Sequence, residues 1–124
     1  MKKLLSAFCI VLIVIGCKSE QKLSVGRWSG YLTPMNHPEM QAPISYLVDY
    51  INNELQISII GPGNSIIPAN NTFLTTDTLY FSFYEPEEQL RLQCALGRSE
   101  EISYSGKCID DSGIRAIFTM NEPR

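Results

Sequence analysis

Apolar and polar residues alternate along most of the chain from Val25 onward, and this pattern constrains the fold more than any other feature of the sequence. A repeat of two residues is typical of antiparallel β-strands with one buried face, whereas a helix needs apolar residues three and four positions apart. We therefore expect strands and no long helix. The clearly alternating runs lie at residues 28–32, 44–50, 55–59, 79–84, 90–96, 102–108 and 114–120.

Short turn-forming segments separate these runs. Asn52-Asn53 and Asp110-Asp111-Ser112-Gly113 consist of residues that adopt turn conformations at low cost. We expect further turns at residues 70–71 and 97–99. With a short extended segment at residues 66–68, the pattern predicts about eight strands.

This number of strands favours a closed barrel. An open sheet of the same size would leave two exposed edges, which promote aggregation. We therefore predict that residues 25–124 form one all-β domain, a small antiparallel up-and-down barrel of about eight strands. The interior of such a barrel is just wide enough for side chains to fill, so inward-facing rings leave little room for a ligand. The rings expected to face inward are those of Trp28, Tyr46, Tyr50, Phe81, Phe83, Tyr104 and Phe118.

The first 16 residues have the pattern of a bacterial export signal. Two lysines precede an apolar run, Leu4 to Ile15, that is shorter than the ~20 residues needed to span a bilayer. The run ends in Val14-Ile15-Gly16-Cys17, which resembles a bacterial lipobox. The resemblance implies that residues 1–16 are removed and that Cys17 receives diacylglycerol, with palmitate-type acyl chains. An ordinary secretory signal with a chance cysteine is the alternative.

A lipid on Cys17 would make the membrane a partner of this protein. Each buried methylene contributes ~0.8 kcal/mol, so two or three acyl chains give a stable anchor. Residues 17–24 would then be the lipidated cysteine and its tether. In the sorting pattern of such lipoproteins, an aspartate after the cysteine retains the protein in the inner membrane. Lys18 occupies that position here and favours the outer membrane, although the periplasmic and surface faces stay open.

Three short motifs are spread along the expected barrel. They are Gly26-x-Trp28-x-Gly30-x-Leu32, Ile67-Pro68 followed by Thr78-Leu79-x-Phe81, and Ile102-x-x-x-Gly106 ahead of residues 114–118. Together they resemble the small lipocalin-like β-barrel module of exported bacterial proteins, which often precedes an α/β-hydrolase domain. The resemblance implies a barrel fold and supplies no catalytic residue. The chain departs from the pattern at Cys108, where an aromatic residue is usual.

Two of the four cysteines remain in the expected barrel, since Cys9 leaves with the signal and Cys17 takes the lipid. An oxidising envelope permits a disulfide between Cys94 and Cys108. However, a turn at residues 97–100 would place Cys94 beside Ser103, which leaves Cys108 ~16 Å further along the strand. The Cα atoms of a disulfide are usually about 4.4–6.8 Å apart. We therefore expect two buried free thiols, with the disulfide as the alternative.

The loop between the first two expected strands contains the sole histidine, His37. If the barrel has a ligand mouth, Met35, His37 and Met40 are its best candidates. A solvent-exposed loop histidine is the alternative interpretation. Zinc normally needs three or four protein ligands, and His37 with Glu39 supplies too few. We therefore predict no metal site and no cofactor.

The outward side chains of the run at residues 79–84 suggest a contact face. Tyr80 and Tyr84 would point away from the core, with Ser82 between them, and outward aromatic side chains often form contact surfaces. Packing of these tyrosines against a loop or the N-terminal segment is the alternative.

Charge and missing motifs exclude several function classes. Without the signal, 8 basic and 13 acidic residues give a net charge of about −5, which disfavours nucleic acid as a partner. Neighbouring carboxylates on a strand point to opposite faces, so we expect the acidic clusters to be solvated turns rather than acid–base pairs. No Gly-x-Ser-x-Gly or phosphate loop is present, so we expect no enzyme activity.

We favour a protein-binding or structural module with an envelope protein as partner. Binding of a small apolar or amphiphilic ligand inside the barrel is the alternative.

Overall fold

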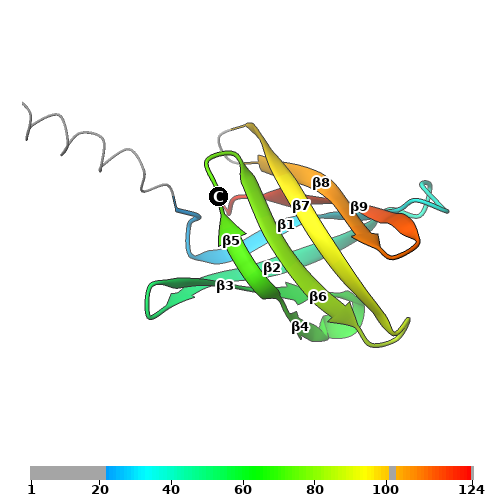
Figure 1. Cartoon of the computed structure of the whole chain (residues 1–124), viewed down its shortest axis with the longest axis horizontal. Coiled ribbons are helices and arrows are strands. Elements are labelled where there is room, and N and C mark those ends of the chain that lie inside the picture. The colour runs from blue at the N-terminus through cyan, green and yellow to red at the C-terminus, as the bar shows by residue number, and fades with distance from the viewer. Residues whose placement is uncertain (1–21, 101–102, 124) are drawn as a thin grey trace, which may run out of the picture.

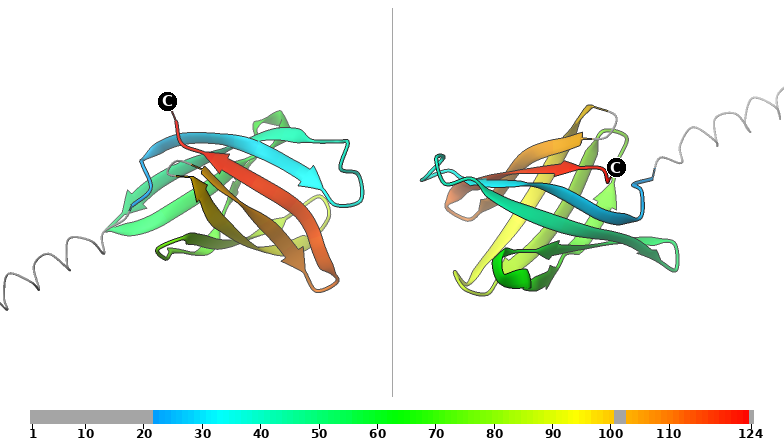
Figure 2. Two further views of the ribbon diagram at one scale, coloured as in Figure 1. Left: turned by 90° about the horizontal axis from the view of Figure 1, so that it is seen from above. Right: turned by 180° about the vertical axis from the view of Figure 1, so that it is seen from behind.

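The computed structural model describes residues 22–100 and 103–123, and these form an antiparallel barrel (Figure 1). In the sheet the strand order is β4-β3-β2-β1-β9-β8-β7-β6-β5. Strands that are consecutive in the chain pair with each other, except β4 and β5, which lie at the two ends of this order. The last strand, β9, pairs with β1 and so joins strands β1–β4 to strands β5–β9 (Figure 2). The elements are β1 (Gly26–Pro34), β2 (Ala42–Ile51), β3 (Glu54–Ile60), the short 3-10 helix η1 (Pro62–Asn64), β4 (Ile66–Pro68), β5 (Asn70–Leu74), β6 (Thr78–Glu85), β7 (Leu90–Glu100), β8 (Ser103–Asp110) and β9 (Gly113–Asn121).

The predicted all-β, up-and-down barrel is confirmed, with nine strands in the described residues instead of about eight. The additional strand is β5, which begins where we expected a turn. Asn71 has the positive φ of a turn residue, 52°, but the chain continues as a strand after it. The pairing of β5 with β6 shifts between Asn70 and Phe73, as at a β-bulge. Asn70 and Asn71, which we expected to form a turn, therefore form a bulge at the start of β5.

Aromatic rings fill the barrel interior. Six of the seven rings predicted to face inward are no more than 5% exposed, and Tyr50 is half-buried near one end. The ring centroids of Phe83 and Phe118 lie 6.0 Å apart, and those of Trp28 and Tyr104 lie 6.3 Å apart. The six buried rings are those of Trp28, Tyr46, Phe81, Phe83, Tyr104 and Phe118.

Two glycines allow neighbouring strands to approach closely. A Cβ atom on Gly30 would lie 1.8 Å from the backbone oxygen of Thr119, and one on Gly106 would lie 2.0 Å from that of Ala95. Neither position has room for a side chain. Beside Gly30, the hydroxyl of the buried Tyr46 donates a hydrogen bond to the same Thr119 oxygen at 2.9 Å. Burial raises the pKa of Tyr46, so this hydroxyl stays protonated as a donor.

The segment 22–25 packs across one end of the barrel. Leu23 is buried in the core, and its backbone N–H donates to the Tyr50 hydroxyl at 3.0 Å. Trp28 Nε1 donates to the backbone oxygen of Ser24 at 2.9 Å, and the Ser24 hydroxyl donates to the Glu122 carboxylate. The described part of the segment that we expected to be a tether is therefore fixed to the barrel.

The two ends of the barrel carry different loops. The tether end, as we call it, has the segment 22–25 and the turns 52–53 and 75–77. The opposite, distal end has the loop 35–41 and the turns 86–89 and 111–112 (Figures 1 and 2).

A disulfide joins Cys94 on β7 to Cys108 on β8, with Cα atoms 4.1 Å apart. Our expectation of two free thiols is therefore wrong. The error came from the expected turn at residues 97–99, because β7 continues through this stretch and pairs Gly97 with Ser105. The resulting register places the two cysteines directly opposite each other.

The disulfide predicts a specific product of trypsin digestion. Without reduction, mass spectrometry should find peptide 92–98 linked to peptide 108–115, and reduction should release both with one free thiol each. Replacing both cysteines with alanine should lower the free energy of unfolding by about 3 kcal/mol, because the crosslink restricts the unfolded chain. Alkylation of both thiols in the unreduced, denatured protein would contradict the pairing.

Candidate functional site

The outer surface of β5 to β8 carries the predicted contact residues. Tyr80 and Tyr84 are 36% and 45% exposed, so neither is covered by a loop or by the described N-terminal segment. Ser82, between them, is buried, and its hydroxyl donates to the Asn70 backbone oxygen at 3.3 Å. The face predicted from the sequence, Tyr80 and Tyr84 with Ser82 between them, therefore covers only part of the exposed surface here. We define the contact face as Phe73, Tyr80, Tyr84, Arg91, Gln93, Ala95, Lys107 and Ile109.

Phe73 forms an exposed aromatic pair with Tyr80. The ring centroids are 4.7 Å apart and the ring planes are inclined by 21°, so the rings are stacked. Phe73 is 54% exposed even in this arrangement. Sequence reasoning missed Phe73 because the preceding asparagines suggested a turn. An exposed stack of two rings is the kind of apolar surface that marks binding sites.

A groove of about 460 Å³ runs beside Tyr80 on the contact face. Register explains the groove, because Ala95 on β7 lies between Tyr80 on β6 and Lys107 on β8. Ala95 has a small outward side chain, and beside it the groove is lined by the backbone of Gly106, so the surface is low between the larger neighbours. The complete lining is Tyr80, Gln93, Cys94, Ala95, Gly106, Lys107 and Ile109.

The contact face is cationic although the chain as a whole is acidic. Its charged members are Arg91 and Lys107, and both are exposed. The chain carries a net charge of −3. The outward positions paired around these cations are neutral and include Thr78, Tyr80, Ser82 and Tyr84 on β6, Gln93, Ala95 and Gly97 on β7, and Ser105 and Ile109 on β8. Asp110 and Asp111 line the polar cleft beside Arg91 and Ile109.

The loop expected to form a ligand mouth lies at the distal end. Met35, His37 and Met40 are all exposed. The backbone N–H of Met35 donates to the Arg115 oxygen at 3.0 Å, which fastens the loop to β9. His37 Nδ1 lies 3.6 Å from a Glu39 carboxylate oxygen, and both side chains are in solvent. The clefts described in this section are lined by other residues, and the role of this loop in binding stays a prediction.

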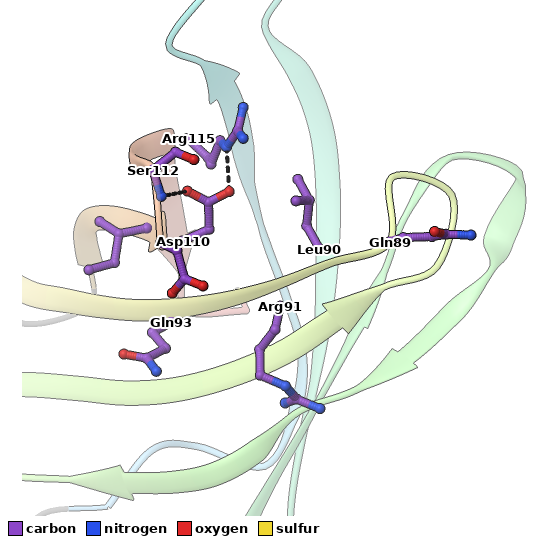
Figure 3. Close-up of a pocket in the computed structure, with 9 residues that line it drawn as sticks. Gln89, Leu90, Arg91, Gln93, Asp110, Ser112 and Arg115 are labelled. Carbon is purple, nitrogen blue, oxygen red and sulfur yellow. Dashed lines mark hydrogen bonds and ion pairs between the residues drawn. The ribbon is translucent and has the colours of Figure 1, made fainter.

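A polar cleft of about 490 Å³ opens at the distal end, where the β6–β7 and β8–β9 hairpins diverge (Figure 3). Asp110 lies in this cleft and accepts hydrogen bonds from Arg115 Nε at 2.7 Å and from the Ser112 N–H at 2.8 Å. The Asp110 side chain is only 8% exposed, so the expectation of a solvated turn is wrong for this residue. Arg91, although it also lines the cleft, points away from Arg115 (Figure 3). The arrangement stabilises the β8–β9 turn rather than directing two guanidinium groups at one ligand.

Within residues 22–100 and 103–123, no three or more histidine, cysteine, aspartate or glutamate side chains are grouped so that they could hold a metal ion. No helix in that part of the chain is long and apolar enough to cross a membrane.

The hydrogen bond from Arg115 lowers the pKa of Asp110, and the Ser112 N–H lowers it further. The ionised carboxylate should therefore stabilise the fold above the unfolded-state pKa of about 3.8, and this contribution should disappear as the pH falls through the lower folded-state pKa. We predict that Asp110→Asn lowers the melting temperature at pH 7 and that the difference from the unaltered protein closes in acid. The exposed neighbour offers a control, since Asp111→Asn should change little at either pH. An Asp110→Asn effect that is independent of pH would contradict this role.

Comparison with known proteins supports the fold and no more. No family model matches the chain, and no curated protein matches it. A solved structure described as a redesigned β-barrel is similar, with a TM-score of 0.61 and 13% sequence identity over 81% of this chain and 91% of that one. At this identity the likeness establishes a shared barrel architecture.

Proposed function

We propose that this protein is a lipoprotein of the bacterial cell envelope, anchored through Cys17, whose small barrel binds another protein on its contact face. The observation that carries the proposal is the division of the aromatic residues between the two sides of the barrel wall. Large rings fill the interior, while Phe73, Tyr80 and Tyr84 remain exposed on one side of the exterior. Exposed aromatic side chains are enriched where proteins bind one another.

The packed interior argues against the alternative of a ligand inside the barrel. Tyr46 and Phe118 are at most 1% exposed, and the side chains of Leu79, Leu96 and Met120 are completely buried among the rings. A ligand the size of a fatty acid would have to displace several of these side chains. Binding on the outer wall requires no such rearrangement.

The fixed N-terminal segment determines how an anchored barrel would sit. Lys22 is the fifth residue after Cys17, so the lipid can lie at most ~17 Å from the point where the chain meets the barrel. The Nζ atom of Lys22 lies 5.4 Å from the centre of the Tyr50 ring, at the tether end. The tether end would thus face the membrane, and the contact face would stand on the side wall.

Lipid attachment predicts that full-length protein made in bacteria incorporates alkyne-tagged palmitate and sediments with membranes. Cys17→Ser should abolish both properties, because the acyl acceptor is lost. Cys9→Ser is the matched control, since Cys9 belongs to the removed signal, and it should keep the label. Unlabelled, freely secreted protein would contradict the anchoring.

The contact face predicts a position-dependent photocrosslink in cells. A benzophenone amino acid in place of Tyr84 should give a discrete crosslinked protein band. The same amino acid in place of Leu47 should give none, although the two side chains are similarly exposed, at 45% and 39%. Leu47 is on β2, on the opposite wall of the barrel. Equal crosslinking from both positions, or none from position 84, would contradict a specific contact face.

A further inference from the structure

The residues of the contact face lie in successive levels along the strands, where a level is a set of residues opposite one another on β6, β7 and β8, and the order of these levels defines a recognition pattern. Tyr80, Ala95 and Lys107 lie opposite one another across β6, β7 and β8 and form the first level. Two residues nearer the distal end, Gln93 pairs with Ile109, and two further on, Arg91 pairs with Tyr84. The face therefore presents a cation, an apolar centre and a second cation in that order.

The apolar centre has the character of a pocket for one side chain. The groove is bounded by the Tyr80 ring on one side and Ile109 on the other, and its floor is formed by Ala95 and Gly106. Ile109 is 41% exposed, so it has surface to bury against a ligand. A branched aliphatic side chain would bury apolar area on both walls, at roughly 25 cal/mol per Å².

The spacing of the two cations matches that of an extended peptide. Lys107 lies opposite Ala95, which is four residues from Arg91 on the same strand, so the cations are separated by roughly 13 Å along the strand direction. In an extended chain, side chains four residues apart are separated by the same ~13 Å and point to the same side, with one further side chain between them.

Resting on the function proposed above, we propose that the contact face recognises an extended acidic segment of its protein partner, in which an apolar side chain lies between two carboxylates, in the pattern acidic-x-apolar-x-acidic. The carboxylates pair with Lys107 and Arg91, and the apolar side chain enters the groove between Tyr80 and Ile109. Arg91 and Lys107 carry this assignment, because they are the charged members of the face on a chain whose net charge is negative, and the acidic residues of the neighbouring cleft, Asp110 and Asp111, lie at its distal end.

An anionic lipid surface would also attract two cations, but it fits the face less well. A flat array of headgroups has no side chain to place in a groove about 460 Å³ in volume. The face also lies on the side wall, whereas the membrane of an anchored protein would be at the tether end. We therefore treat lipid binding as an outcome of the test.

The proposal is tested by NMR with full-length, isotope-labelled protein in detergent micelles. The probe is the capped peptide Glu-Ser-Leu-Ser-Glu, with Lys-Ser-Leu-Ser-Lys and Glu-Ser-Ser-Ser-Glu as comparison peptides. Only the first should shift the backbone amide signals of Ala95, Lys107 and Ile109, with a dissociation constant on the order of 1 mM. Equal shifts from the basic peptide, shifts elsewhere on the barrel, or competition by anionic phosphatidylglycerol vesicles would overturn the proposal.

Matched variants separate recognition from folding. Lys107→Glu should weaken the acidic peptide about tenfold or more, because it places like charges together. Arg27→Glu makes the same change of charge on β1 and should alter the affinity less than twofold. Ile109→Ser should weaken binding, whereas Leu47→Ser should not, although the exposed fractions of the two side chains are 41% and 39%. Lys107→Gln is the milder variant if charge reversal disturbs the fold.

The two proposals fail in different ways. If position 84 captures a protein but the acidic peptide does not bind, the assigned partner chemistry is wrong and the protein-binding function stands. If the peptide binds but position 84 captures nothing in cells, the protein-binding function is wrong.

Discussion

The register of β7 against β8 is the constraint on which the outer surface of this barrel depends. Cys94 and Cys108 are directly opposite each other and covalently joined, so the two strands cannot slide past one another. A slip of one residue in a strand exchanges its inner and outer faces. With Cys94 held inside, Ala95 must face outward beside Lys107, and this places the groove next to a cation. The disulfide lies in the core, but it determines which side chains of β7 and β8 are on the outer surface.

Close approach of the strands supports the same register. Gly106 is the residue opposite Leu96, and its missing side chain lets the backbones of β7 and β8 come together. Gly106 faces inward together with Leu96, so it contributes to the outer groove only through its backbone, which forms part of the floor.

Sequence reasoning reached the architecture because alternation is a local signal. The ring of Trp28 packs near that of Tyr104 and the ring of Phe118 near that of Phe83, both distant in the sequence, yet each ring is identified by its position within its own run. The register between two strands, in contrast, cannot be read from either strand alone. An error of a few residues in the expected turn at 97–99 was enough to separate Cys94 from Cys108, which the structure joins.

The contact face could be predicted only in part for the same reason. Tyr80 and Tyr84 were identified from alternation within a single strand. Phe73 was missed because its strand begins at a bulge, where Asn71 has the φ of a turn residue. The groove was also missed, since it exists only where Ala95 and Gly106 meet across two strands. Likewise, nothing local distinguishes Asp110, which binds Arg115, from the exposed Asp111 beside it.

The position of Leu23 links the proposed anchor to the proposed recognition. Because Leu23 is buried, residues 22–24 are held at a fixed point of the barrel, from which the proposed tether would extend. Arg91 lies nine residues from Glu100 at the other end of β7, a distance of ~30 Å along the strand, or ~20 Å in height for a typical strand tilt. The Debye length is about 8 Å at physiological ionic strength, so the potential of anionic headgroups is largely screened at that height. Even with the proposed anchor holding the barrel on the membrane, Arg91 would therefore be available to a carboxylate on the proposed protein partner.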